Sequence, residues 1–216
     1  MAPLPDDVQH LLTSAVLADV LDGLGHRHSA LPPDVRPLRP TWKLFGQAAT
    51  LSAMPVTAEP VHPYAVELEC LDALRPGQVL VTTTNGDRGS ALWGELLSTA
   101  ARARGAAGVV LDGLTRDAAR ILAMDYPVFA AGFSPLDSKG RLDGVSHGQP
   151  IRIGACLIRP GDWVFGDIDG VVVMPVEFAE TAFARALEKV SSENRVREEL
   201  ARGRSIREVF AEYRIL

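Results

Sequence analysis

The chain has 216 residues, of which 47% are hydrophobic and 23% are charged. This apolar content is enough to offset the entropy of ordering the chain, which excludes an intrinsically disordered protein, and the length fits one domain, over residues 1–216. The net charge is -5 and no basic block occurs, so nucleic acid is not an expected partner.

The cysteine content and the N-terminus limit the cellular setting. Cys70 and Cys156 are the only cysteines, and their separation predicts two isolated buried thiols rather than a disulfide framework or a zinc site. Residues 1–10 lack the basic and apolar regions of a signal peptide, and no stretch approaches about 18 uninterrupted apolar residues. We therefore expect a soluble, cytoplasmic protein without a membrane partner.

The first predicted element is an amphipathic helix over residues 13–24, where apolar residues recur at helical spacing. Thr13 or Ser14 is a candidate N-cap, and Gly25 is placed to end the helix. The next expected elements are a stiff proline-rich connection, a strand and a helix, over 30–40, 47–54 and 64–74.

A strand, a loop, a helix and a second strand follow, over residues 79–84, 85–90, 90–104 and 108–113. Both strands are rich in β-branched residues, as is typical of buried strands. This order predicts a right-handed βαβ unit, and therefore a parallel sheet at this point.

The second half of the chain is predicted to contain a helix, a strand and a long loop, over 115–124, 126–132 and 133–150. Short strands joined by tight turns are expected to pair antiparallel, over 151–158, 162–167 and 170–175. Residues 176–213 are helical by their pattern, with Gly203 dividing a long helix from a short one.

The sequence GVSHG, residues 144–148, matches the G-x-S-x-G pattern of hydrolase nucleophile elbows. An elbow needs a strand before the serine and a helix after it, whereas Pro150 and a predicted strand follow here. His147 is also the last histidine of the chain, so no catalytic histidine can come later. We therefore reject a serine hydrolase.

A stronger candidate site joins the two ends of the βαβ unit. Gly94 and Glu95 lie near the start of one predicted helix and Arg116 and Asp117 begin the next, with 20 residues between Glu95 and Arg116. Loops at the carboxyl ends of parallel strands gather at one sheet edge, and the helix N-termini there attract anions. Arginine suits a carboxylate, and aspartate suits Mg²⁺ or Mn²⁺. The alternative is that Asp117 only caps its helix beside an Arg116 surface ion pair.

This spacing, with twenty residues between Gly-Glu and Arg-Asp, resembles the G-D-x20-R-D signature of the RraA-like family. The family contains class II 4-hydroxy-4-methyl-2-oxoglutarate aldolases and regulators of ribonuclease E activity. Three longer segments are also similar to the family, at residues 18–25, 93–117 and 158–175, so the resemblance covers roughly residues 13–200. The departure is Glu95, where the aldolases have aspartate. Because glutamate is longer by one methylene, the sequence does not determine the geometry of the metal-bound water or the size of the substrate.

The resemblance implies an α/β fold of the phosphohistidine swivelling-domain type, a single domain whose central mixed sheet is flanked by helices. It also implies a homotrimer or homohexamer, with the C-terminal helical segment 176–213 used in the oligomer contacts.

The resemblance further implies a role for each site residue. Asp117 would bind a divalent cation, Mg²⁺ or Mn²⁺, and Arg116 would bind substrate. Substrate would also meet the loop backbone at Gly94, Glu95, Leu96 and Leu97. Glu95, and Glu193 from a neighbouring subunit, would hold the metal through water. For Glu193 the alternative is a solvated position on a highly charged helix.

The activity implied is a pyruvate-releasing lyase acting on a short 2-oxo acid by retro-aldol cleavage or decarboxylation, with Arg116, Asp117 and Glu95 as catalytic residues. Arg116 and the metal would stabilise an enolate, and a metal-bound water would be the base. No lysine lies in the βαβ unit, which disfavours a Schiff base. Two alternatives stay open: a non-catalytic regulator that binds a ribonuclease or another protein, and a lyase for an unrelated acid.

Overall fold

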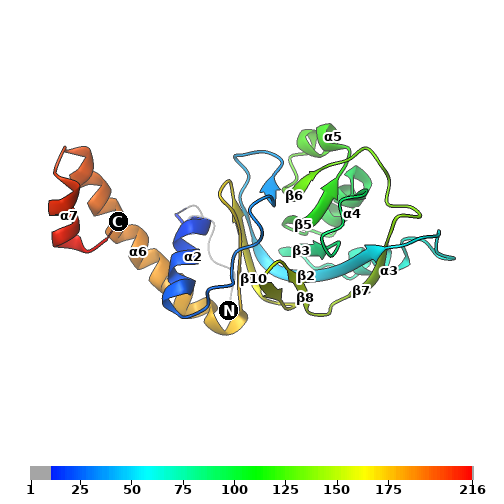
Figure 1. Ribbon diagram of the computed structural model, residues 1–216, viewed down its shortest axis with the longest axis horizontal. Coiled ribbons are helices and arrows are strands. Elements are labelled where there is room, and N and C mark those ends of the chain that lie inside the picture. The colour runs from blue at the N-terminus through cyan, green and yellow to red at the C-terminus, as the bar shows by residue number, and fades with distance from the viewer. Residues whose placement is uncertain (1–10, 216) are drawn as a thin grey trace.

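The computed structural model describes residues 11–215 and contains a mixed sheet flanked by helices (Figure 1). The strands of the nine-stranded sheet follow the order β1-β6-β5-β3-β2-β10-β11, with β4 paired to β5 and β7 paired to β2, while β8 and β9 form a separate pair. This arrangement confirms the predicted α/β class. Residues 1–10, where no targeting segment is expected, lie outside the described residues.

The strands are β1 (Arg36–Pro37), β2 (Leu44–Pro55), β3 (Gln78–Thr83), β4 (Ala91–Trp93), β5 (Gly108–Thr115), β6 (Val128–Phe133), β7 (Leu142–His147), β8 (Ile151–Ile153), β9 (Cys156–Ile158), β10 (Trp163–Asp167) and β11 (Gly170–Met174). The helices are α2 (Ser14–Gly23), α3 (Ala65–Asp72), α4 (Glu95–Ala103), α5 (Ala118–Ala123), the 3₁₀ turn η1 (Val176–Phe178), α6 (Ala179–Ala201) and α7 (Ile206–Tyr213).

The helices form two groups (Figure 1). α3, α4 and α5 lie beside the parallel strands, where Trp93, Leu111 and Ile121 are fully buried in a shared apolar cluster. α2 and α6 pack against β10 and β11, and α6 then extends away from the sheet toward α7. The first group surrounds the candidate site described below.

The predicted βαβ unit is confirmed, because β3 and β5 pair parallel with Val79 opposite Gly108. Nearly every residue of both strands is buried, which explains their continuous apolar sequences. β6 also runs parallel to β5. The carboxyl ends of these strands therefore meet at the same edge of the sheet.

The helix predicted over residues 90–104 is wrong at its start. Residues 91–93 form the strand β4, which pairs parallel with the end of β5 through Trp93 and Thr115, and α4 begins only at Glu95. The apolar residues Ala91 and Leu92 fit either structure by pattern. Pairing with a strand more than twenty residues away decides in favour of β4.

The long loop predicted over residues 133–150 is also partly wrong, because Leu142–His147 form β7 and pair antiparallel with β2. Its polar composition hides the strand, which obtains its backbone partners from the unusually long β2. Ser146 lies within this strand opposite Ser52 and no helix follows, so the rejection of a nucleophile elbow is confirmed.

The predicted terminal helices and thiols agree with the structure. Thr13 is the N-cap of α2, where its hydroxyl accepts a hydrogen bond from the Val16 amide at 3.3 Å, and Gly203 separates α6 from α7 with a φ of +84°. Cys70 and Cys156 are free and buried, and burial raises the pKa of each thiol to about 12. None of the helices in residues 11–215 is both long and apolar enough for a membrane span.

Candidate active site

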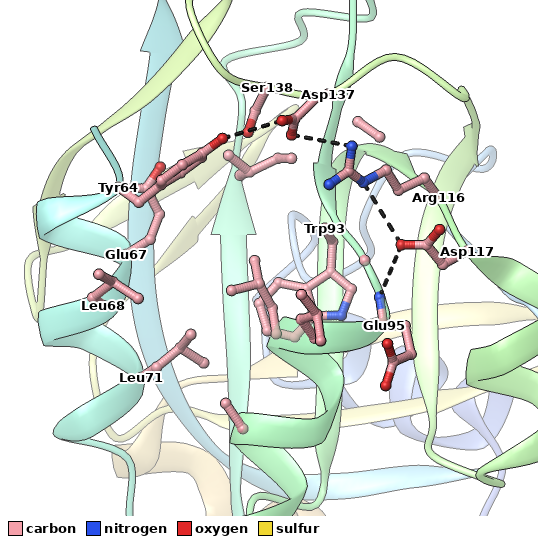
Figure 2. Close-up of a pocket in the computed structure, with 16 residues that line it drawn as sticks. Tyr64, Glu67, Leu68, Leu71, Trp93, Glu95, Arg116, Asp117, Asp137 and Ser138 are labelled. Atoms are coloured by element: carbon pink, nitrogen blue, oxygen red, sulfur yellow. Dashed lines mark hydrogen bonds and ion pairs between the residues drawn. The ribbon is translucent and has the colours of Figure 1, made fainter.

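The Gly94-Glu95 loop and the Arg116-Asp117 loop lie side by side at the carboxyl ends of β4 and β5 (Figure 2). The Arg116 amide donates a hydrogen bond to the Trp93 carbonyl at 2.9 Å, which extends the strand pairing by one residue. The expectation that the two loops converge is therefore confirmed. The chemical roles of their residues stay predictions.

Gly94 is the position where this convergence leaves no room for a side chain. Its backbone is extended, with a φ of −157° that any residue can adopt, so conformational freedom does not explain the glycine. A Cβ atom there would lie 2.9 Å from Asp117 Oδ2 and 3.2 Å from Arg116 Cγ. Glycine therefore allows the functional groups of the neighbouring loop to approach the backbone.

The alternative considered from sequence is met in part. Arg116 Nε lies 3.6 Å from Asp117 Oδ2 in a partly exposed ion pair, and Asp117 occupies the N-cap position of α5 without a capping hydrogen bond from its side chain. The Asp117 backbone is left-handed, with a φ of 55°. The carboxylate instead turns toward the other loop, where Oδ2 lies 3.4 Å from the Glu95 amide nitrogen. Left-handed backbone is uncommon outside glycine, although aspartate tolerates it better than most residues. The Asp117 carboxylate is 44% exposed at this edge.

The Arg116 guanidinium lies between two carboxylates (Figure 2). Its Nη1 is 3.2 Å from Asp137 Oδ1, and its Nε is 3.6 Å from Asp117 Oδ2. Tyr64 donates a hydrogen bond from its hydroxyl to Asp137 Oδ2 at 3.2 Å. Burial and then the Asp137 charge raise the pKa of Tyr64. This chain of contacts fixes the direction in which Arg116 points.

Asp137 and Tyr64 were not identified from the sequence. A usable signal existed for Asp137, because it follows β6, whose carboxyl end lies at the same sheet edge as that of β5. Tyr64 precedes α3 with a left-handed φ of 66°, and nothing in its sequence context indicates that its hydroxyl reaches a residue 73 positions later.

Glu95 begins α4, and its carboxylate is turned along the helix, away from Asp117 (Figure 2). Thr99 donates a hydrogen bond from its hydroxyl to Glu95 Oε1 at 2.9 Å. Leu96 and Leu97 follow in the first turn of α4, where the backbone amides lack partners within the helix. The first turn of α4 therefore lines the cavity together with Arg116.

A cavity of about 400 Å³ opens in front of the two loops, a volume suited to a small ligand. Its walls come from α3, β4, α4 and the loops after β5 and β6. They comprise Tyr64, Glu67, Leu68, Leu71, Ala91, Leu92, Trp93, Gly94, Glu95, Leu96, Leu97, Ala100, Arg116, Asp117, Asp137 and Ser138.

Glu67 is a buried acid in this wall that the sequence analysis did not identify. Its Oε1 accepts a hydrogen bond from the Gly144 amide at 2.9 Å, while Oε2 has no hydrogen-bond partner. Burial and the nearby Asp143 charge raise the pKa of the Glu67 carboxyl. Gly144 belongs to β7, so this contact depends on the strand that the sequence did not reveal.

Glu193 is the expected site residue that the fold of one chain does not bring to the cavity. It lies on α6, in the helical group away from the site, and Lys189 Nζ is 3.5 Å from its Oε1. Lys189 Nζ also lies 2.9 Å from Asp19 Oδ2 of α2. The expected contribution of Glu193 to a neighbouring subunit stays a prediction.

The donor set at this edge fits a weakly held divalent cation better than a closed metal centre. Within residues 11–215, no group of three histidine, cysteine, aspartate or glutamate side chains is arranged to hold a metal ion. Mg²⁺, however, commonly binds through one or two carboxylates and takes its other ligands from water and substrate. The Asp117 carboxylate, which is 44% exposed at the cavity edge, meets that requirement.

The fold and the site together define an α/β protein with an arginine-carboxylate cavity at the carboxyl ends of its parallel strands. The family described as RraA-like, Aldolase/RraA, matches residues 14–173. The chain therefore belongs to the RraA-like family.

Individual relatives cover different parts of the chain. "Putative 4-hydroxy-4-methyl-2-oxoglutarate aldolase 3" of Arabidopsis thaliana is 33% identical over 68% of this chain and 87% of its own length. Protein DlpA of Legionella pneumophila is 27% identical over 97% of this chain, which spans only 34% of that protein. The crystal structure of Streptomyces coelicolor RraAS2, described as an unusual member of the RNase ES inhibitor RraA family, matches with a TM-score of 0.79 and 29% identity, covering 91% and 98% of the two chains.

Proposed function

We propose that the protein is a divalent-metal-dependent lyase that cleaves a short 2-oxo acid and releases pyruvate. The observation that carries the proposal is the convergence of Arg116, Asp117 and the first turn of α4 on one cavity. A guanidinium, a partly exposed carboxylate and the backbone amides of a helix N-terminus are groups suited to binding a 2-oxo acid and its metal ion. The name of the aldolase relative supports the same class of reaction.

Each group has a place in the proposed reaction. The α4 amides bind the substrate carboxylate, and Arg116 donates hydrogen bonds to the C2 keto oxygen. Asp117 would hold Mg²⁺ or Mn²⁺, which supplies Lewis acidity to that oxygen when bound. Asp137 and Tyr64 keep the guanidinium directed into the cavity.

Cleavage breaks the C3–C4 bond. Glu95, after its carboxylate turns from Thr99 toward the cavity, accepts the C4 hydroxyl proton directly or through one water, and C4 becomes the carbonyl carbon of the leaving product. The electron pair moves through C3 to the C2 oxygen as an enolate, where Arg116 stabilises the developing negative charge. Protonation of C3 then yields pyruvate. Decarboxylation of oxaloacetate would form the same enolate.

The test is a panel of 2-oxo acids, with added Mg²⁺ or Mn²⁺ and then with EDTA, in which pyruvate is measured by a coupled dehydrogenase. Arg116→Ala is expected to lower kcat by about 10² to 10³ fold, the usual effect of removing one oxyanion donor. Arg88→Ala is the matched control, because Arg88 pairs with Asp34 and does not line the cavity. The proposal fails if no 2-oxo acid yields pyruvate with either metal.

A second candidate function is a non-catalytic regulator that binds a ribonuclease. The likeness to RraAS2, which is described as belonging to an RNase ES inhibitor family, favours it. Inhibition of a purified ribonuclease by the intact protein, unchanged by Arg116→Ala and without pyruvate release, would select this function over the lyase.

We also propose that the C-terminal helices contact other copies of the chain in a trimer or hexamer. α6 extends away from the sheet (Figure 1), and the exposed side chains of Ile206 and Phe210 on α7 offer apolar surface for such a contact. Glu193 would then reach the neighbouring cavity. Light scattering of the intact protein and of Phe210→Asp tests the assembly, and a monomeric intact protein would refute it.

A further inference from the structure

The cavity contains one cation and four carboxyl groups, and this imbalance bears on which substrate it accepts. Among the described residues that line it, Arg116 alone carries a positive charge. The acids are Glu67, Glu95, Asp117 and Asp137. Arg116 Nη1 lies 3.2 Å from Asp137 Oδ1, so the Arg116 guanidinium already forms an ion pair before any substrate binds. One substrate carboxylate can be bound at the α4 amides, beside the divalent cation proposed at Asp117, but a carboxylate beyond C4 would meet no cationic side chain among the described residues of the lining.

Cations near the cavity but outside its lining have partners of their own. Lys139 Nζ lies 2.9 Å from Glu59 Oε1. Arg141 donates a hydrogen bond from Nη1 to the Asp137 carbonyl at 3.0 Å. Neither side chain lines the cavity.

The wall away from Arg116 is apolar. Leu68 and Leu71 of α3 face the cavity across from α4 (Figure 2). Leu92, Leu97 and Ala100 continue this surface. Leu68 is 53% exposed and Leu96 is 76% exposed, so apolar surface here is open to solvent in the chain alone. Covering it with an apolar group of a ligand is favourable.

Glu67 adds an acid to the same wall, beside Leu68 and Leu71. Its Oε2 is buried and has no hydrogen-bond partner. A carboxylate brought into this wall would lose part of its hydration, and when Glu67 is ionised it would also meet a like charge; both effects are unfavourable. An alkyl or aryl group meets neither penalty.

We infer that the site is selective for 2-oxo acids with a single carboxylate, in which the part of the molecule beyond C4 is uncharged and apolar, and that it discriminates against dicarboxylates. This inference rests on the proposed function. For a 4-hydroxy-2-oxo acid, the C3–C4 bond breaks and the C4 hydroxyl becomes a carbonyl. The products are pyruvate and an apolar aldehyde or ketone.

The experiment compares 4-hydroxy-2-oxohexanoate with 4-hydroxy-4-methyl-2-oxoglutarate, using the intact protein with Mg²⁺ or Mn²⁺. We expect kcat/KM for the monocarboxylate to be at least about 10-fold higher, because an unpaired charge in a pocket is a strong basis for discrimination. A preference for the dicarboxylate would overturn the inference and leave the lyase proposal intact.

A binding measurement separates the two proposals even if no cleavage occurs. Calorimetric titration with 2-oxohexanoate and with 2-oxoglutarate, both lacking the C4 hydroxyl, should show tighter binding of the monocarboxylate. Equal binding or tighter binding of 2-oxoglutarate would refute the selectivity. Absence of pyruvate from every substrate would refute the lyase reaction instead.

A charge introduced into the apolar wall should reverse the preference. Leu68→Arg is expected to raise the relative kcat/KM, or the relative affinity, for the dicarboxylate by about 10-fold or more. Leu96→Arg serves the same purpose if the first variant does not fold. Ile168→Arg is the matched control, since Ile168 is 56% exposed and does not line the cavity. A Leu68→Arg protein that folds and keeps the original preference would count against the inference.

Discussion

Asp112 and Asp117 lie at the two ends of the short segment DGLTRD, and their surroundings are opposite. Asp112 is 7% exposed and accepts hydrogen bonds from the Thr83 hydroxyl at 2.7 Å and from the Thr84 amide at 2.6 Å. Asp117 is 44% exposed, and its nearest backbone donor, the Glu95 amide, is 3.4 Å away.

The difference separates a carboxylate that holds strands together from one that is available to a ligand. Asp112 has no free acceptor capacity directed at a cavity, because Thr83 and Thr84 of the neighbouring strand end occupy it. Asp117 is partly exposed and lies beside Arg116 at the cavity. The number of hydrogen bonds that each carboxylate accepts is therefore the basis for proposing Asp117, and not Asp112, as a site residue.

Asp117→Asn should give the largest functional effect. We expect pyruvate release to fall on the order of 10³-fold, since the variant loses the charge proposed to hold the metal. Stability should change by less than about 0.5 kcal/mol, as for an exposed side chain. Coupled assays and denaturant unfolding measure both quantities. A large loss of stability with full activity would reverse the distinction between the two aspartates.

Gly94→Ala tests whether close approach around Asp117 matters. The added methyl group would lie 2.9 Å from Asp117 Oδ2, while the extended backbone accepts alanine without strain. We expect kcat to fall about 10²-fold in a folded protein, as a displacement of about 1 Å can cause. Gly23→Ala is the control, because no neighbouring group lies within 4 Å of the position that its added methyl group would occupy. Wild-type activity in Gly94→Ala would show that the contact is dispensable.

Asp112→Asn should affect stability instead. Its amide group would face the Thr84 donors, and leaving buried donors without an acceptor costs about 1 to 3 kcal/mol. Chemical denaturation of Asp112→Asn and Asp117→Asn side by side measures the contrast. Equal stability of the two variants would contradict the structural role assigned to Asp112.

Glu67→Gln probes a third carboxyl that is buried like Asp112 but has one oxygen without a partner. Burial raises the Glu67 pKa in the folded state. Protonated Glu67 therefore makes its full contribution to stability below the ordinary glutamate pKa, and this contribution is lost as pH rises through the raised pKa and Glu67 ionises. Glutamine keeps the acceptor for the Gly144 amide and has no such loss.

The melting temperature of Glu67→Gln relative to the wild type should therefore increase as pH rises from about 4 to about 8. Asp143 is the other titratable group that acts on Glu67, and Asp143→Asn should reduce the same dependence by a smaller amount. A difference independent of pH would exclude a raised Glu67 pKa.

The fold was predictable wherever a segment carries its own periodic pattern. The α2 helix, with its Thr13 cap, and the buried strands β3 and β5 agree with the predictions. β4 and β7 were missed because short strands of ambiguous or polar composition exist only through pairing with β5 and β2.

The site was predictable in part for the same reason. Gly94, Glu95, Arg116 and Asp117 could be placed together because the carboxyl ends of adjacent parallel strands meet. The residues missed, Tyr64, Glu67 and Asp137, lie on segments whose positions at the cavity depend on contacts far along the chain.

The amino-acid sequence by itself determined the secondary structure of the periodic segments, the parallel βαβ unit and the pairing of an arginine with an aspartate at one sheet edge. Only the tertiary structure decided that the Asp117 side chain lines a cavity and makes no capping hydrogen bond, that Asp137 and Tyr64 orient Arg116, and that the remaining wall is apolar and acidic. Local spacing fixes backbone periodicity, whereas the direction of a side chain and the charge around it are set by neighbours distant in the chain.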